Sequence, residues 1–218
     1  MFICITLLVA TFFFTWSMIL RQTAAFLLKD CIDRWSVPLF SIFDFFTTIF
    51  WLFTAYKIHN FLPAYFLFFS ALWITIHTDL KHMLISRFVT LYLIPIAIFL
   101  AYTNFLPISW LESALTAIVS YLLFWMINKI FYFAKGYDGL GQGDFELIAM
   151  ISAFTGMLGC WFTILCASLT GMMISVSYML CAQKFIRILP FGPFLAFGAA
   201  TFVLYQSEIL EFLTRYSS

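Results

Sequence analysis

Long apolar runs separated by short polar stretches dominate the chain, and this pattern predicts membrane helices. A helix that crosses about 30 Å of hydrocarbon needs about 20 predominantly apolar residues. Breaks in the apolar pattern divide the chain into eight segments, at residues 2–20, 39–56, 61–78, 88–104, 109–133, 145–157, 159–181 and 191–210. The segment at 145–157 is short and can join the next one through Gly156 and Gly159. The pattern therefore predicts an all-α, polytopic transmembrane helix bundle of about eight segments, within a range of six to eight.

Composition excludes the soluble alternative. Hydrophobic residues make up 64% of the 218 residues and charged residues only 10%, whereas an average soluble domain is about 45–50% apolar and about 25% charged. A soluble fold of this size cannot hide so much apolar surface, so we expect the lipid bilayer to surround most of the chain. The net charge of +1 shows no basic field, so no nucleic-acid partner is predicted.

The basic residues predict which side of the membrane each loop faces. With the amino end outside, the inner loops hold nine of the eleven Lys and Arg residues, and only Lys57 and Arg215 lie outside. This distribution follows the positive-inside rule. All four sizeable polar stretches are then cytoplasmic: residues 21–36, 79–87, 134–146 and 182–190. We therefore expect any chemistry that uses polar groups at the cytoplasmic face.

Two aspartates stand at the edges of apolar runs. Asp79 follows the run that ends at Thr78, and Asp144 precedes another run. A carboxylate at membrane depth is costly unless it is paired or near water, which makes such residues functional candidates by default. An ordinary interfacial charge at a helix end also explains either aspartate taken singly.

Glycines and paired acids together suggest a chemistry. Gly139, Gly141 and Gly143 alternate before Asp144, and a backbone without side chains permits the close approach of an extended peptide or of another helix. Two carboxylates brought together can share one proton, so that one acts as a base on water while the other polarises a carbonyl group. This chemistry needs no metal and no cofactor. We therefore select Asp79 and Asp144 as candidate catalytic residues, and Gly141 and Gly143 as supporting residues for substrate approach.

Three stretches carry a resemblance to a known family. Residues 79–91 are similar to an acid followed by an Ile-Pro-Asn/Asp-x-Leu-Thr-Leu-Pro turn, and residues 138–149 are similar to Glu-Gly-Met-Gly-x-Gly-Asp-x-Lys-Leu-Leu-Ala. Residues 189–199 match Pro-Phe-Gly-Pro-Phe-Leu-Ala-Leu-Gly-Ala closely. In this order, over roughly residues 72–200, they resemble the bacterial type IV prepilin peptidases, which are membrane aspartyl proteases of the GxGD kind.

The resemblance implies a function for the two aspartates. Asp79 and Asp144 align with the catalytic pair of the family. The implied reaction removes the leader from membrane-inserted prepilins or pseudopilins, after a glycine, at the cytoplasmic face of the bacterial inner membrane. The implied protein is a single membrane-embedded peptidase domain over residues 1–218.

The chain also departs from the family pattern. Ser86 replaces a proline, and Glu146 replaces a lysine, where we expect Glu146 to face the cytoplasm or to pair with Lys81 or Lys135. A cytoplasmic loop at residues 21–38, with Cys31 as its sole thiol, stands in place of an insert with two CxxC pairs. A zinc site needs about four ligands, so we predict no metal, no cofactor, and peptidase activity without N-methylation of the new terminus.

Three alternatives remain open. A non-enzymatic, ion-coupled or proton-coupled membrane transporter would use the two acids on its conduction path. An intramembrane protease of the presenilin kind would need Tyr-Asp on a neighbouring helix, and Tyr137-Asp138 lies too close to Asp144 for that. A catalytically inactive accessory protein of pilus assembly would not require both acids and the glycines. The sequence assigns no oligomeric state.

Overall fold

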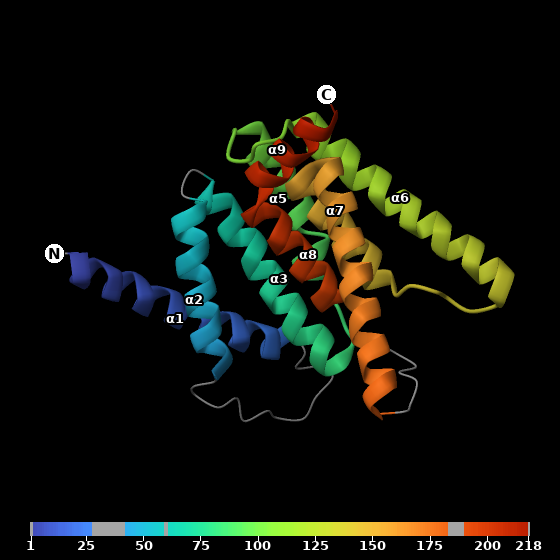
Figure 1. The fold of residues 1–218 in the computed structure, drawn as a ribbon, viewed down its shortest axis with the longest axis horizontal. Coiled ribbons are helices and arrows are strands. Elements are labelled where there is room, and N and C mark those ends of the chain that lie inside the picture. Colours follow the sequence, from blue (N-terminus) through green and yellow to red (C-terminus); the bar gives the residue numbers. More distant parts are fainter. Residues whose placement is uncertain (1, 28–41, 59–60, 183–189, 218) are drawn as a thin grey trace.

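The computed structural model describes residues 2–27, 42–58, 61–182 and 190–217. Every regular element within these ranges is a helix (Figure 1). In chain order they are α1 (Phe2–Leu27), α2 (Ile42–Lys57), α3 (Leu62–His82), α4 (Arg87–Thr90), α5 (Leu93–Tyr102), α6 (Trp110–Lys135), α7 (Gln142–Ala182), α8 (Gly192–Leu204) and α9 (Gln206–Ser217). The predicted all-α class is confirmed.

The helices follow the predicted segments with a few differences. The segment predicted at 88–104 is divided into the short α4 and the longer α5. The two segments predicted at 145–157 and 159–181 form α7, whose backbone leaves the helical conformation at Gly156 (φ 72°, ψ −174°). The segment predicted at 191–210 bends by 75° between α8 and α9. The loop predicted at 21–38 begins as helix up to Leu27, and its remainder, with Cys31, lies outside the described residues.

The number of membrane crossings stays a prediction. Among the described residues, α6 and α7 are long and apolar enough to span a membrane by length and composition. The bent pair of α8 and α9 makes a third span if the two helices cross together. The apolar helices therefore fit a membrane protein. By length and composition, two or three spans are found among the described residues, and the predicted number of six to eight is not confirmed.

Local sequence signals set where α6 begins and where it ends, before the loop that leads to Asp144. Ser109 caps α6 by accepting a hydrogen bond from the backbone N–H of Glu112 at 3.1 Å, a Ser-x-x-Glu arrangement typical of helix starts. Gly136 ends α6 in the left-handed conformation (φ 79°), which glycine adopts without a steric penalty. The chain can therefore turn back through residues 137–141 into α7.

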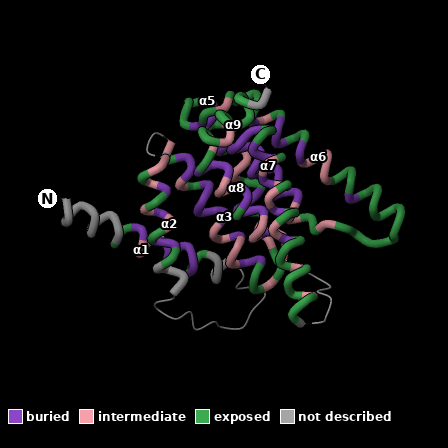
Figure 2. Tube along the Cα trace, in the orientation of Figure 1, coloured by how far each residue is buried: buried purple, intermediate pink, exposed green. Residues whose placement is uncertain are grey.

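The core lies where α7 and α8 pack together, between α3 and α6 (Figures 1 and 2). The rings of Phe68 in α3 and Phe154 in α7 lie 4.9 Å apart between centroids, and both side chains are fully buried. A Cβ atom at Gly198 would lie 2.7 Å from the carbonyl oxygen of Thr163. This close approach of α8 to α7 requires glycine, and it sets the position of the amino end of α8.

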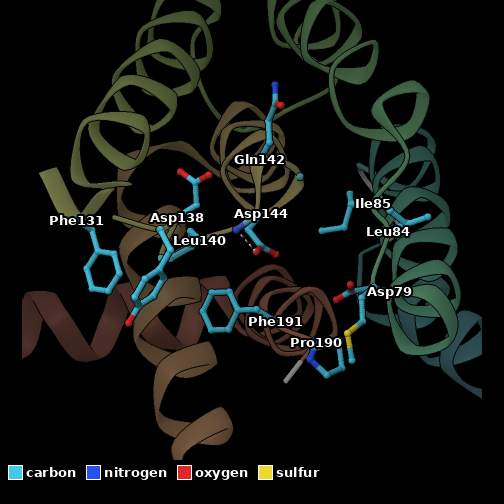
Figure 3. Close-up of a pocket in the computed structure, with 15 residues that line it drawn as sticks. Asp79, Leu84, Ile85, Phe131, Asp138, Leu140, Gln142, Asp144, Pro190 and Phe191 are labelled. Carbon is cyan, nitrogen blue, oxygen red and sulfur yellow. Dashed lines mark hydrogen bonds between the residues drawn. The ribbon is translucent and has the colours of Figure 1, made fainter. Parts of the chain in front are cut away.

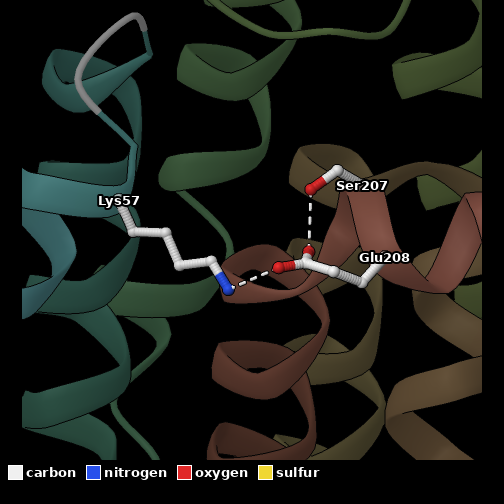
Figure 4. Close-up of polar contacts among 3 residues, drawn as sticks. All are labelled: Lys57, Ser207 and Glu208. Carbon is white, nitrogen blue, oxygen red and sulfur yellow. Dashed lines mark hydrogen bonds and ion pairs between the residues drawn. The ribbon is translucent and has the colours of Figure 1, made fainter.

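A surface contact holds α2 to the carboxy-terminal helix. Lys57 donates to Glu208 at 2.8 Å, and Ser207 donates to the other carboxylate oxygen of Glu208 at 2.7 Å (Figure 4). The ammonium group of Lys57 also lies 3.6 Å from the ring centroid of Tyr205. Lys57 is thus at the end of the molecule where α3 begins, whereas Asp79 lies about 26 Å further along the α3 axis at 1.5 Å per residue.

Candidate active site

One pocket of about 940 Å³ brings the two aspartates together. Asp79 comes from the last turns of α3 and Asp144 from the first turn of α7. Figure 3 shows their carboxylates pointing toward each other across the pocket. The rest of the wall consists of the segment after α3, the end of α6, the loop before α7 and the residues before α8: Met83, Leu84, Ile85, Phe131, residues 137–143, Pro190 and Phe191.

The Asp79 carboxylate is held by the amino end of α8. Asp79 is only 4% exposed, and its Oδ2 accepts a hydrogen bond from the backbone N–H of Gly192 at 2.8 Å. The amino end of a helix carries unsatisfied N–H groups and a partial positive charge, which favour an anion. A Cβ atom at residue 192 would lie 2.7 Å from the same oxygen, so this contact requires glycine.

The Asp144 carboxylate is held by the loop that precedes its own helix. The backbone N–H of Gly141 donates to Asp144 Oδ2 at 3.3 Å, which is a long hydrogen bond. A Cβ atom at Gly141 would lie 3.2 Å from this oxygen. Two acids from helices distant in sequence therefore face one pocket, and each accepts a hydrogen bond from a glycine N–H.

The two glycines selected from the sequence have different surroundings. Gly141 contacts the carboxylate of Asp144, whereas Gly143 packs against the side chain of Ile85 in the segment after α3. A Cβ atom at Gly143 would lie 2.8 Å from the Cβ atom of Ile85. Gly143 thus permits close contact between the segments that carry the two aspartates. Gly192, which holds Asp79, was not selected from the sequence, although the matched stretch at 189–199 contains it.

Asn128 is a second residue that sequence reasoning missed. It lies on α6, is 8% exposed, and binds the loop before Asp144 at three points. Its side-chain oxygen accepts from the backbone N–H groups of Gly139 at 2.9 Å and Leu140 at 3.0 Å, and its Nδ2 donates to Asp138 Oδ1 at 2.9 Å. The sequence signal that could have identified Asn128 is its amide side chain within a largely apolar stretch of α6. Asn128 therefore fixes the course of the glycine loop.

Replacing Asn128 by alanine is expected to loosen this loop. The change removes the three hydrogen bonds between Asn128 and the loop, and each contributes about 0.5–1.5 kcal/mol to the free energy of unfolding. Hydrogen exchange should show lost protection at Gly139 and Leu140, with protection retained in α8. Lys129→Ala, at the exposed neighbouring position, serves as the control. Unchanged exchange at Gly139 and Leu140 in Asn128→Ala would contradict the assigned role.

Glu146 corrects one expectation from the sequence. We expected it to face the cytoplasm or to pair with Lys81 or Lys135. It is instead 2% exposed, and its Oε1 lies 3.2 Å from Nε of Arg87 at the start of α4. The reason is the helical period, because two residues on a helix turn the side chain about 200° away from Asp144 and toward α4.

No group of three or more His, Cys, Asp or Glu side chains that could hold a metal ion occurs within the described ranges. Cys160, Cys166 and Cys181 are free thiols. The loop with Cys31 is outside these ranges, so the absence of a zinc site stays a prediction.

Comparison with known proteins places the chain in a family. The profile of the type IV leader peptidase family matches residues 66–176, just over half of the chain. This match contains α7 up to Val176 and both aspartates. No solved structure matches the chain.

Curated relatives agree with this match. A protein of Dichelobacter nodosus is 31% identical over 131 residues, which cover 60% of this chain and 44% of that protein. One of Stutzerimonas stutzeri is 37% identical over 102 residues, 45% of this chain and 35% of that protein. One of Legionella pneumophila is 29% identical over 150 residues, 67% of this chain and 52% of that protein. All three are named prepilin leader peptidase/N-methyltransferase, and the chain spans about half of their length or less. Because the family profile matches more than half of the chain, the chain belongs to the type IV leader peptidase family.

Proposed function

We propose that this chain is an aspartic endopeptidase that removes the leader peptide of type IV prepilins or pseudopilins after a glycine. The observation that carries the proposal is the placement of Asp79 and Asp144 on one pocket by two helices distant in sequence. The names of the matched relatives support a prepilin substrate. The matched region contains both aspartates, which supports a proteolytic role for them.

The two carboxylates can hydrolyse a peptide bond by sharing one proton. Like charges at short range cannot both ionise readily, so one carboxyl group keeps its proton. The ionised carboxylate removes a proton from a water molecule, which attacks the carbonyl carbon. The protonated carboxyl group donates its proton to the carbonyl oxygen. Collapse of the tetrahedral intermediate re-forms the C=O bond and returns that proton to the second carboxylate. The amine leaves with the proton that the first carboxylate removed from water.

The pocket wall suits an extended peptide. Gly141 presents backbone without a side chain next to Asp144, so a peptide backbone can come close to the acid there. Gly143 supports this approach indirectly, because its contact with Ile85 holds the wall of the pocket in place. The aromatic side chains of Phe131, Tyr137 and Phe191 line the same pocket. They provide an apolar surface for the hydrophobic segment that a membrane-inserted prepilin carries after its leader.

The proposed location is the bacterial inner membrane, with several membrane crossings and the pocket at the cytoplasmic face. The bias of Lys and Arg residues supports this orientation. Lys57 and α9, which carries Arg215, lie together at one end of the molecule, and Asp79 lies toward the other end of α3. We treat residues 1–218 as one membrane-embedded peptidase domain in which the loop at 21–38 stands in place of a zinc-binding insert.

The transporter alternative has less support. A conduction path needs polar groups at successive depths of the membrane, whereas Asp79 and Asp144 belong to the same pocket. The family match also favours proteolysis. A catalytically inactive accessory protein of pilus assembly would not require two acids that face one pocket.

Mass spectrometry of a processed prepilin tests the proposal directly. The full chain, reconstituted in liposomes with a membrane-inserted prepilin, should release the leader and leave the residue after the glycine as an unmethylated amino terminus. A prepilin with its leader glycine replaced by valine is the control and should remain intact. An unprocessed native prepilin would contradict the endopeptidase assignment. In a parallel reaction that also contains S-adenosylmethionine as the methyl donor, cleavage followed by methylation would contradict the single-activity prediction alone.

A further inference from the structure

A buried ion pair next to the pocket takes no part in the chemistry described above. Glu146 lies on α7, one helical turn or less from Asp144, and its side chain is 3% exposed. Its Oε1 lies 3.2 Å from Arg87 Nε, while the Arg87 side chain is 61% exposed. Its other oxygen, Oε2, is buried and accepts no hydrogen bond. A buried carboxylate without a cationic partner is strongly unfavourable, so Glu146 depends on Arg87.

The ion pair connects the two segments that carry the aspartates. Arg87 is the first residue of α4, and the chain between Asp79 and Arg87 lines the pocket through Met83, Leu84 and Ile85. Ile85 packs against Gly143, immediately before Asp144. Contacts with the segment after Asp79 therefore occur on both sides of Asp144, at Gly143 through packing and at Glu146 through charge.

We propose that Arg87 and Glu146 are a positioning pair that sets the separation of Asp79 and Asp144. The pair holds the start of α4 against α7, which keeps Ile85 on Gly143 and fixes the chain that leads back to Asp79. The inference rests on the proposed function where it concerns catalysis. The contact between the two segments does not depend on it.

A charge-swap experiment in the full chain tests this pair. Glu146→Lys and Arg87→Asp, each alone, are expected to lower kcat for prepilin cleavage about 100-fold, because a displacement of about 1 Å at reacting groups costs that much. KM should stay within about twofold, since neither side chain lines the pocket. Combining the two substitutions should restore kcat to within about fivefold of the native chain, because the pair is then formed with reversed charges.

The controls separate positioning from general destabilisation. Glu208→Gln breaks the exposed ion pair with Lys57 at the far end of the fold and should leave cleavage unchanged. Glu146→Gln keeps the side-chain shape without its charge and is expected to lower kcat about 10-fold. It replaces Glu146→Lys in the comparison if the lysine variant does not accumulate in membranes.

A second measurement does not require cleavage. Val89→Cys, in a chain whose native cysteines are replaced by serine, places a thiol in α4, where Val89 is only 7% exposed. Its reaction with a maleimide should be about 10-fold faster when either charge is reversed alone and should return to the starting rate in the double variant. If the native chain cleaves no prepilin, the proposed function fails while this rate still decides the ion pair. A double variant as impaired and as reactive as the single variants, or single variants that label at the starting rate, would overturn the proposal.

Discussion

Replacing either Asp79 or Asp144 by asparagine is expected to abolish prepilin cleavage, with kcat lowered about 10⁴-fold or more, because each acid moves a proton that asparagine cannot move. The fold should remain intact. An asparagine oxygen at position 79 can still accept the hydrogen bond from Gly192, and one at position 144 can still accept from Gly141. The measurement is single-turnover cleavage of a prepilin by each purified variant in liposomes.

A matched amide substitution gives the control for this prediction. Glu211→Gln makes the same chemical change at an exposed position of α9 and should cleave like the native chain. The two aspartate variants should also show the same thermal unfolding temperature as the native chain to within a few degrees. Full processing by either variant would remove that aspartate from the mechanism and would favour the transporter alternative.

Replacing Gly192 by alanine is expected to lower kcat about 100-fold, because the added methyl group displaces the Asp79 carboxylate. The new Cβ atom would lie 2.7 Å from Oδ2 and 3.2 Å from Cγ of Asp79. The carboxylate is the atom group that gives way, since the backbone of α8 is held against α7 by the close contact at Gly198. Steady-state kinetics should show the loss in kcat with the unfolding temperature little changed.

Gly141→Ala provides a graded comparison with Gly192→Ala. Its Cβ atom would lie 3.2 Å from the Asp144 carboxylate, so the displacement is smaller and we expect about a 10-fold loss in kcat. Phe197→Ala, at an exposed position of α8, tests whether any change in this helix has the same effect and should not. Native activity in Gly192→Ala would show that the carboxylate of Asp79 does not need its present position.

Features of the site that depend on neighbouring residues in the sequence could be predicted, whereas features that depend on contacts between distant residues could not. The glycine loop before Asp144 is recognisable from the sequence, because Gly139, Gly141, Gly143 and Asp144 lie within six residues of one another. Asn128, which fixes the course of this loop, lies on α6, 11 residues before Gly139. Its role depends on how far α6 extends before Gly136 reverses the chain.

Glu146 illustrates the same limit for charges. The sequence placed basic residues at several loop ends, and proximity along the chain or in the expected topology favoured Lys81 or Lys135 as partners. The direction of the Glu146 side chain depends on the rotation of α7 about its axis. That rotation is set by packing against α6 and α8, and it turns the carboxylate toward Arg87.

The sequence by itself determined the all-α class, the approximate bounds of most helices, and the two acids at the edges of apolar runs. These follow from local properties, namely hydrophobic run length, capping residues and the cost of a charge near lipid. Only the tertiary structure decided that Asp79 and Asp144 face one pocket, and that Gly192, 113 residues from Asp79, holds its carboxylate. Those contacts depend on how α3, α7 and α8 pack, and packing is a property of several helices together that no single segment encodes.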